Sequence, residues 1–427
     1  MPLSVSSGGG SPKRTVAKRN RKRDIYNLTH GLEARVIEEK KDFKQFGTRS
    51  AMGVVLSVMK RMVELDVLRG FLLLMMVANH SPSPLRQITD QPIGFFSTAE
   101  AFVFISALLA GLVFQQRRDK LGFAAARAAT LQRALRIYRA HLITLFVVFA
   151  VGSLFLASVP GIRYILSKFF DSPTSAVAGS VALLFQPPLL DILPMYVIFS
   201  LVTPLAFWIA GRVGWRPVFA TSVGLWLLSQ FNVREFLTAP VRDQAFVQIG
   251  PFDLFSWQLL WMAGLMFGRS LQQGKSLLRF SPRTEVVLLF LAIGFTLSRW
   301  TCAYLNFDAS GNFRFLDKWH LGPLRLLNFF LVAWFVAKAM PYLGRWREYL
   351  RPLSAVGQNM LPIFSTQICL SVFVAGWISV RHHSVDAFAT LLLLLQVVIA
   401  FVVAYLLEYW KDRSIAPRAI SPAVTVA

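Results

Sequence analysis

The residues most suited to chemistry lie on one apolar stretch, where Arg69 is followed eleven positions later by His80. Asp66 and Asn79 belong to the same stretch, and most of the residues between them are leucine, methionine, valine and phenylalanine. A charge at the centre of a membrane-spanning helix costs roughly 2.5–3.5 kcal/mol unless it faces a partner or a wet cavity. The pattern therefore indicates a functional site. The alternative is an interfacial Asp66–Arg69 ion pair and a His80 that only caps the helix.

Helical geometry gives the spacing of Arg69 and His80 a chemical meaning. Eleven helical residues rise about 16 Å, which is half of a hydrocarbon core. An anion held at Arg69 and a reaction at His80 would thus be joined by a long, thin molecule, a shape that the arm of coenzyme A has. Histidine suits the role of general base because it exchanges a proton near physiological pH.

Two further sets of residues complete this predicted site. Glu100 begins the next apolar stretch and is predicted to lie near the depth of His80, where Glu100 or Asn79 would orient the imidazole. The alternative for Glu100 is a helix cap.

Three arginines then recur at every third residue of the sequence. Guanidinium groups bind phosphates in a bidentate manner. We predict that they hold the phosphates of coenzyme A, with an ordinary basic helix flank as the alternative. They are Arg133, Arg136 and Arg139.

Polar and aromatic residues also gather toward one side of the predicted bundle. Carbohydrate sites combine aromatic platforms with carboxylates and amides, so these residues predict an acceptor site, although each alone is explained by hydrogen bonding between helices. The residues assigned a supporting or acceptor-side role are Asp66, Asp191, Asp317, His320 and Asn359, of which Asn359 is not expected toward the outer half.

The elements that must position these residues are membrane helices. Hydrophobic residues make up 55% of the 427-residue chain, and its mean hydropathy of +0.52 is high for a soluble domain. We predict an all-α polytopic membrane protein, because the apolar runs lack the alternation of a barrel. About ten segments are long enough to span: 66–81, 93–115, 137–158, 190–211, 216–231, 252–271, 284–303, 320–341, 354–378 and 387–410.

Charge placement predicts the orientation and the domains. The net charge of +23 is concentrated in residues 1–65 and in alternate loops, which the positive-inside rule assigns to the cytoplasm. Both termini are therefore predicted to be cytoplasmic, and nucleic acid is not an expected partner. We expect a basic, largely disordered tail over 1–59, a transmembrane domain over 60–412 and a short tail over 413–427. The first 60 residues lack the pattern of a cleavable signal peptide.

No familiar cofactor or metal motif is present. Cys302 and Cys369 are too far apart for a metal-binding pair. We predict no metal site and no permanently bound cofactor, with an acyl-coenzyme A as a donor substrate.

The residues described above resemble a known family. Arg69 and His80 resemble the Arg-x10-His signature of the acyltransferase-3 superfamily, and Arg133 with Arg136 resembles its Arg-x-x-Arg motif. Several further stretches are similar to OpgC-type succinyltransferases of osmoregulated periplasmic glucans, over roughly residues 60–410. They are Asp66-Val-Leu-Arg69-Gly70 with Ala99-Glu100, Asp191-Ile-Leu-Pro194-Met-Tyr196, Ser256-Trp257-Gln258, Pro323-Leu-Arg325 and Gly357-Gln358-Asn359. The stretch Phe102-Val-Phe104-Ile-Ser106-Ala107 is similar to a motif of the wider superfamily, with Ala107 where glycine is usual.

This resemblance implies a multi-pass protein of the bacterial inner membrane that moves an acyl group to a periplasmic glucan. Succinyl-coenzyme A would be the donor, held by the arginines, and His80 would activate a glucan hydroxyl. A transient acyl-histidine stays open as a second route. The alternatives are an acetyltransferase of another envelope polysaccharide or lipid and, in a different class, a proton-coupled transporter or flippase.

Overall fold

The computed structural model describes residues 63–275, 280–378 and 385–415, and the side chains within 63–275, 280–378 and 387–413. The predicted tail over 1–59 and nearly all of the tail over 413–427 lie outside the described residues. Over the described ranges the chain is helical, with no named strand and one isolated bridge between Phe185 and Gln248. The all-α fold class is thereby confirmed.

The long helices follow the predicted apolar segments closely. For example, the segment predicted over 284–303 is helical over 282–304. Short helices occupy the connections: α4 (Arg86–Thr89), α6 (Pro160–Ile165), α7 (Ser167–Asp171), α8 (Pro173–Val181), α11 (Val233–Thr238), α14 (Ala309–Asn312) and α16 (Arg351–Gln358). The long helices are α3 (Val63–His80), α5 (Thr98–Phe155), α9 (Ile192–Val213), α10 (Trp215–Ser229), α12 (Leu254–Gln272), α13 (Pro282–Tyr304), α15 (Pro323–Leu343), α17 (Met360–Ile378) and α18 (Val385–Ile415).

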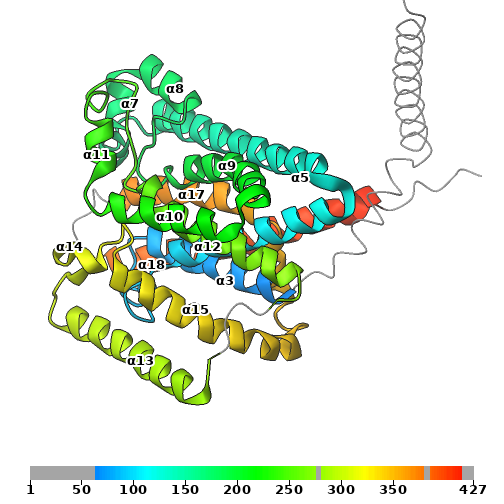
Figure 1. The fold of residues 1–427 in the computed structure, drawn as a ribbon. Coiled ribbons are helices and arrows are strands. Elements are labelled where there is room, and N and C mark those ends of the chain that lie inside the picture. The colour runs from blue at the N-terminus through cyan, green and yellow to red at the C-terminus, as the bar shows by residue number, and fades with distance from the viewer. Residues whose placement is uncertain (1–62, 276–279, 379–384, 416–427) are drawn as a thin grey trace, which may run out of the picture. The chain divides into compact units, whose positions relative to one another are not determined.

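Within the described ranges, 6 helical segments are long and apolar enough to cross a membrane, which makes the chain a multi-pass membrane protein. They lie in α5, α9, α13, α15, α17 and α18 (Figure 1). The site-bearing helix α3 is not among them, because Glu64, Asp66 and Arg69 make its first half polar.

Two predicted boundaries differ from the structure. The basic segment 116–136, predicted as a loop, is part of α5, whose helix is interrupted only at Gly122 with φ of 82° and ψ of 171°. Positive φ is readily available to glycine, so the chain changes direction there and resumes the helix at once. The predicted span over 354–378 is divided at Asn359 into α16 and α17.

Helix α3 is packed against α5, α15, α16, α17 and α18 (Figure 1). Its closest neighbour is α16, because the backbones of the two helices are in direct contact. A Cβ atom at Gly70 would lie 2.0 Å from the carbonyl oxygen of Leu353, and one at Gly357 would lie 1.8 Å from the carbonyl oxygen of Asp66. Small residues permit such close helix contacts in membranes. This contact fixes the turn of α3 that carries Asp66 and Arg69.

Helix α5 is held against α12 in the same way. Gly264 faces Ala107, so that a Cβ at Gly264 would lie 2.6 Å from the Ala107 Cβ. Gly268 and Gly111 make comparable backbone contacts across the two helices. Ala107 stands where glycine is usual in the motif. It is accommodated because the facing residue of α12 is Gly264.

Candidate functional site

The first half of the candidate site surrounds Arg69 on α3. Its Nη1 donates to Asp66 Oδ1 at 3.2 Å and its Nη2 lies 3.4 Å from the sulfur of Met360, while the buried Nε has no hydrogen-bond partner. Arg133 of α5, which is half-buried, is close enough for its charge to act on Arg69 and on the hydroxyl of Tyr196. The structure thus brings together Arg69 and Arg133 from two helices.

This pair of cations lacks a matching pair of anions. Among the described residues, no hydrogen bond or ion pair involves the Arg133 guanidinium, and Asp66 already bonds to Arg69. Two like charges near one another in a low-dielectric region repel unless an anion joins them. The arrangement is suited to a phosphate, which accepts from guanidinium groups in charge-assisted hydrogen bonds.

The remaining two predicted phosphate ligands are placed differently. Arg136 and Arg139 are exposed on α5, and of the two only Arg136 exerts a charge effect on Arg133. Asn359 lies next to Met360 in the chain, and its side chain accepts from Lys411 at 2.5 Å. Asn359 therefore belongs to the Arg69 end of α3, away from His320, and its supporting role stays a prediction.

Among the described residues, three buried polar atoms on α3, α5 and α9 lack a hydrogen bond of good geometry. They are Tyr196 Oη on α9, Ser106 Oγ on α5 and Asn79 Oδ1 on α3. The Asn79 amide nitrogen donates to Thr98 Oγ1 at 3.2 Å, which fixes its oxygen. The hydroxyls of Tyr196 and Ser106 are close enough to each other to bond. Buried polar groups in proteins are normally satisfied, so the Asn79 oxygen is the atom that marks a position where a bound molecule would supply a partner.

The second half of the site is at His80, the last residue of α3. The following residue, Ser81, accepts a hydrogen bond from Gln396 of α18 at 3.0 Å, which anchors this end of the helix. Among the described residues the His80 ring has no hydrogen bond, while the charges of Lys318 and Arg86 act on it. The charge of Lys318 also acts on Asp191, a buried carboxylate at the N-terminus of α9.

Glu100 has partners other than His80. It forms a fully buried ion pair with Arg325 of α15, and its second oxygen accepts from the backbone nitrogen of Ser97 at 3.0 Å and from the Ser97 hydroxyl at 2.5 Å. Both carboxylate oxygens are therefore engaged, and no described contact joins Glu100 to His80. In this structure Glu100 caps α5 and ties it to α15.

Lys318 also lines an open pocket of about 1090 Å³. The pocket is formed by the segment after α3, the end of α13 and the segment before α15. Its wall combines indole and phenol rings with carboxylates and amides, which is the combination expected of a carbohydrate site. The lining includes Asp90, Gln91, Trp300, Tyr304, Asp308, Asp317 and Trp319.

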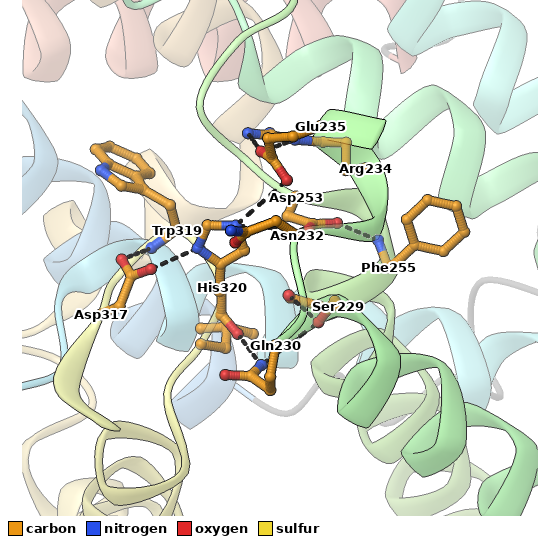
Figure 2. Close-up of polar contacts among 12 residues, drawn as sticks. Ser229, Gln230, Asn232, Arg234, Glu235, Asp253, Phe255, Asp317, Trp319 and His320 are labelled. Atoms are coloured by element: carbon orange, nitrogen blue, oxygen red, sulfur yellow. Dashed lines mark hydrogen bonds and ion pairs between the residues drawn. The ribbon is translucent and has the colours of Figure 1, made fainter. Parts of the chain in front are cut away.

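Asp317 and His320 form a pair beside this pocket (Figure 2). His320 Nδ1 lies 2.5 Å from Asp317 Oδ2, and this hydrogen bond raises the pKa of His320. The other ring nitrogen, Nε2, lies 3.8 Å from Glu235 Oε2 and 3.9 Å from Asp253 Oδ2. Two of the predicted acceptor-side residues, Asp317 and His320, are thus neighbours. The carboxylates of Glu235 and Asp253, which come from distant segments, lie close to His320.

The model of the OpgC protein family matches residues 61–412. The chain belongs to the OpgC family. No curated protein and no solved structure matches the chain. The matched range covers nearly the whole predicted transmembrane domain and both halves of the site. Membership in the OpgC family indicates a glucan-modifying acyltransferase.

Sequence reasoning overlooked several residues that the structure adds to this OpgC site. Lys318 is an isolated lysine in a loop, and Glu235 belongs to a short helix with no distinctive pattern. Tyr196 and Ser106 occur within the motifs that carry the resemblance, and that was the one signal that could have singled them out. The roles of His80, Asn79, Glu100 and the arginines in catalysis remain predictions.

Proposed function

We propose that this OpgC-family protein transfers a succinyl group from cytoplasmic succinyl-coenzyme A to hydroxyl groups of a periplasmic glucan, across the bacterial inner membrane. The observation that carries the proposal is the two-ended arrangement of α3. Arg69 and Arg133, which would bind an anion, lie toward one end, and His80, whose ring has no hydrogen bond among the described residues, lies at the other end within reach of the charge of Lys318, a residue of the pocket wall. The rise of about 16 Å between the ends suits a pantetheine arm.

In the proposed reaction, the phosphates of the donor bind at Arg69 and Arg133, and the thioester lies near His80. The glucan occupies the pocket lined by Trp300 and Trp319. The imidazole of His80 takes the proton of a glucan hydroxyl while the hydroxyl oxygen attacks the thioester carbonyl carbon. The carbon–sulfur bond then breaks, and the departing thiolate takes the proton from the imidazolium. The products are the O-succinyl ester and free coenzyme A.

Lys318 supports a dicarboxylic donor over acetate. The distal carboxylate of a succinyl group would lie a few ångströms beyond the thioester, and Lys318 is the cation whose charge acts on both His80 and Asp191. An acetyl group would leave Lys318 without this partner. This arrangement supports our choice of succinate over acetate as the acyl group.

The experiment uses the full chain in detergent micelles with an osmoregulated periplasmic glucan fraction. Succinyl- and acetyl-coenzyme A are supplied in turn, and free thiol and glucan-bound ester are both measured. We expect thiol release that depends on the glucan, one ester per thiol, and faster reaction with the succinyl donor. Faster reaction with acetyl-coenzyme A would overturn the choice of donor. No thiol release with either donor would overturn acyl transfer and favour the transporter alternative.

A further inference from the structure

Three side chains from separate segments direct unpartnered atoms at one another beside the pocket (Figure 2). The atoms are Glu235 Oε2, Asp253 Oδ2 and His320 Nε2, and all lie within 4.8 Å of one another. Each is buried without a hydrogen-bond partner, and the Asp253 side chain is 0% exposed. A buried carboxylate oxygen is costly unless it is paired or coordinates a metal. A protonated His320 supplies this positive charge in the metal-free protein, and a bound cation would displace that proton and take its place.

The orientation of His320 fits metal coordination. Its Nδ1 is engaged by Asp317 at 2.5 Å, which leaves the lone pair of Nε2 directed at Glu235 and Asp253 when Nδ1 carries the proton. A histidine that binds a metal through one ring nitrogen almost always donates the N–H of its other ring nitrogen to an outer partner, which is a carboxylate, a backbone carbonyl or a water. The Asp317–His320 pair thus has the geometry of a ligand and its supporting residue.

In both the Glu235 and the Asp253 carboxylate, hydrogen bonds hold one oxygen, while the other oxygen has no hydrogen-bond partner. Glu235 Oε1 accepts from Arg234 Nε at 2.9 Å and from Nη2 at 2.6 Å. Asp253 Oδ1 accepts from the backbone nitrogen of Phe255 at 2.7 Å and so caps α12. These bonds fix the direction of the free oxygens before any ion arrives, which reduces the entropy lost on binding.

We propose that Glu235, Asp253 and His320 bind one divalent transition-metal ion, for which Zn²⁺ is the best-suited candidate. Tetrahedral zinc with bonds of about 2.0–2.2 Å separates its ligand atoms by about 3.3–3.6 Å. The separations of 3.8 and 3.9 Å from His320 Nε2 need to shorten by only a few tenths of an ångström. Mg²⁺ and Ca²⁺ prefer more ligands, and prefer them to be oxygen atoms.

The charges in the cluster match a divalent ion. Glu235, Asp253 and Asp317 contribute three negative charges and Arg234 one positive charge, which leaves two negative charges with His320 neutral. The ion would join α11, the start of α12 and the segment before α15, which carry the three ligands. It would hold the wall of the 1090 Å³ pocket to which Asp317 and Trp319 belong. This inference does not depend on the proposed acyl transfer.

The test uses the full chain without a histidine tag, treated with a chelator and purified in detergent. Zn²⁺ is titrated against a chromophoric chelator, with Mg²⁺ and Ca²⁺ as comparison ions. We expect one tight Zn²⁺ site per chain and a higher thermal midpoint after Zn²⁺ is added. His320→Ala and Glu235→Gln should abolish the tight site. Asp317→Asn should weaken it roughly 10–100-fold, as expected of a supporting residue.

Asp308→Asn is the matched control, because Asp308 lines the same pocket but caps α14 instead of joining the cluster. It should bind Zn²⁺ as the wild type does. If the ligand variants fail to fold, Mn²⁺ bound to the wild type is examined by pulsed electron paramagnetic resonance, where an imidazole ligand gives a nitrogen coupling. The proposal is overturned by the absence of tight binding in the wild type, by equal binding in His320→Ala, or by a Mn²⁺ signal without nitrogen.

Discussion

Glu100 at the start of α5 forms a buried ion pair with Arg325 at the start of α15. The pair joins two helices that the chain separates by more than 200 residues. It also fixes the segment between α3 and α5, because Asn328, one turn after Arg325, accepts from the backbone nitrogen of Phe95 at 2.7 Å. The His80 end of the site is thus framed by contacts that α15 makes.

Removing one member of this pair should destabilise the protein strongly. Glu100→Ala leaves the Arg325 guanidinium buried without its anion, and such changes cost about 3–5 kcal/mol. We expect a markedly lower thermal midpoint in detergent. The double variant Glu100→Ala/Arg325→Met should be more stable than Glu100→Ala alone, because the uncompensated charge is gone. Equal stability of the single and double variants would contradict a coupled pair.

The same pair offers a way to test the predicted catalytic role of Glu100. The double variant Glu100→Gln/Arg325→Gln removes both charges and keeps side chains that can hydrogen-bond to each other. If Glu100 acts only by positioning α5, the activity per folded molecule should stay within a few-fold of the wild type. A loss comparable to that of a His80 variant would show that the Glu100 carboxylate acts in the reaction.

Arg133 should determine the affinity for the donor. Arg133→Ala removes charge-assisted hydrogen bonds of about 1.5–3 kcal/mol, which corresponds to roughly a 10–100-fold rise in KM for the acyl-coenzyme A. The turnover number should change little, because this contact is remote from the reacting carbonyl. Arg139→Ala is the control, since Arg139 is exposed on the same helix. Equal effects of the two substitutions would contradict a specific site at Arg133.

Lys318 should determine the choice of acyl group. Lys318→Ala should raise KM for succinyl-coenzyme A about tenfold or more and leave the reaction with acetyl-coenzyme A nearly unchanged, since only succinate offers a second carboxylate. Lys318→Arg should retain most of the preference. Parallel loss with both donors would assign Lys318 to the general electrostatics of the His80 end instead of to the succinyl carboxylate.

The contact between α3 and α16 should tolerate no side chain. Gly357→Ala places a Cβ 1.8 Å from the carbonyl oxygen of Asp66, so the helices must separate, at a cost of at least about 1–3 kcal/mol. Gly224→Ala on α10 has nothing within 4 Å of the added atom and should stabilise its helix by about 0.5–1 kcal/mol. Thermal unfolding of the two variants should therefore shift in opposite directions. A Gly357→Ala variant as stable as the wild type would contradict this packing.

The sequence predicted the helices well because apolar length is a strong signal, and the segment expected over 66–81 is α3, which carries both Arg69 and His80. It was wrong about 116–136, where the arginines, leucines and alanines that suggested a cytoplasmic loop are also good helix formers. Positive charge indicates the side of the membrane and not the local structure.

The partners within the site could not be read from the sequence. Glu100 was expected near His80 because both lie at similar depth, but depth does not show which neighbour a carboxylate meets, and Arg325 was free to take it. Glu235, Asp253 and His320 carry no metal-binding spacing because they come from three separate segments, so only the folded structure brings their atoms together.

The most direct test of the account replaces His80. His80→Ala and His80→Gln are compared with the wild type for glucan-dependent thiol release from succinyl-coenzyme A, after matching the thermal midpoints to confirm folding. If His80 is the base, both variants should lose roughly 100- to 10,000-fold in rate, as expected for a general base, with donor binding retained because Arg69 and Arg133 are untouched. Thiol release at the wild-type rate in either folded variant would contradict the assignment of His80 as the base.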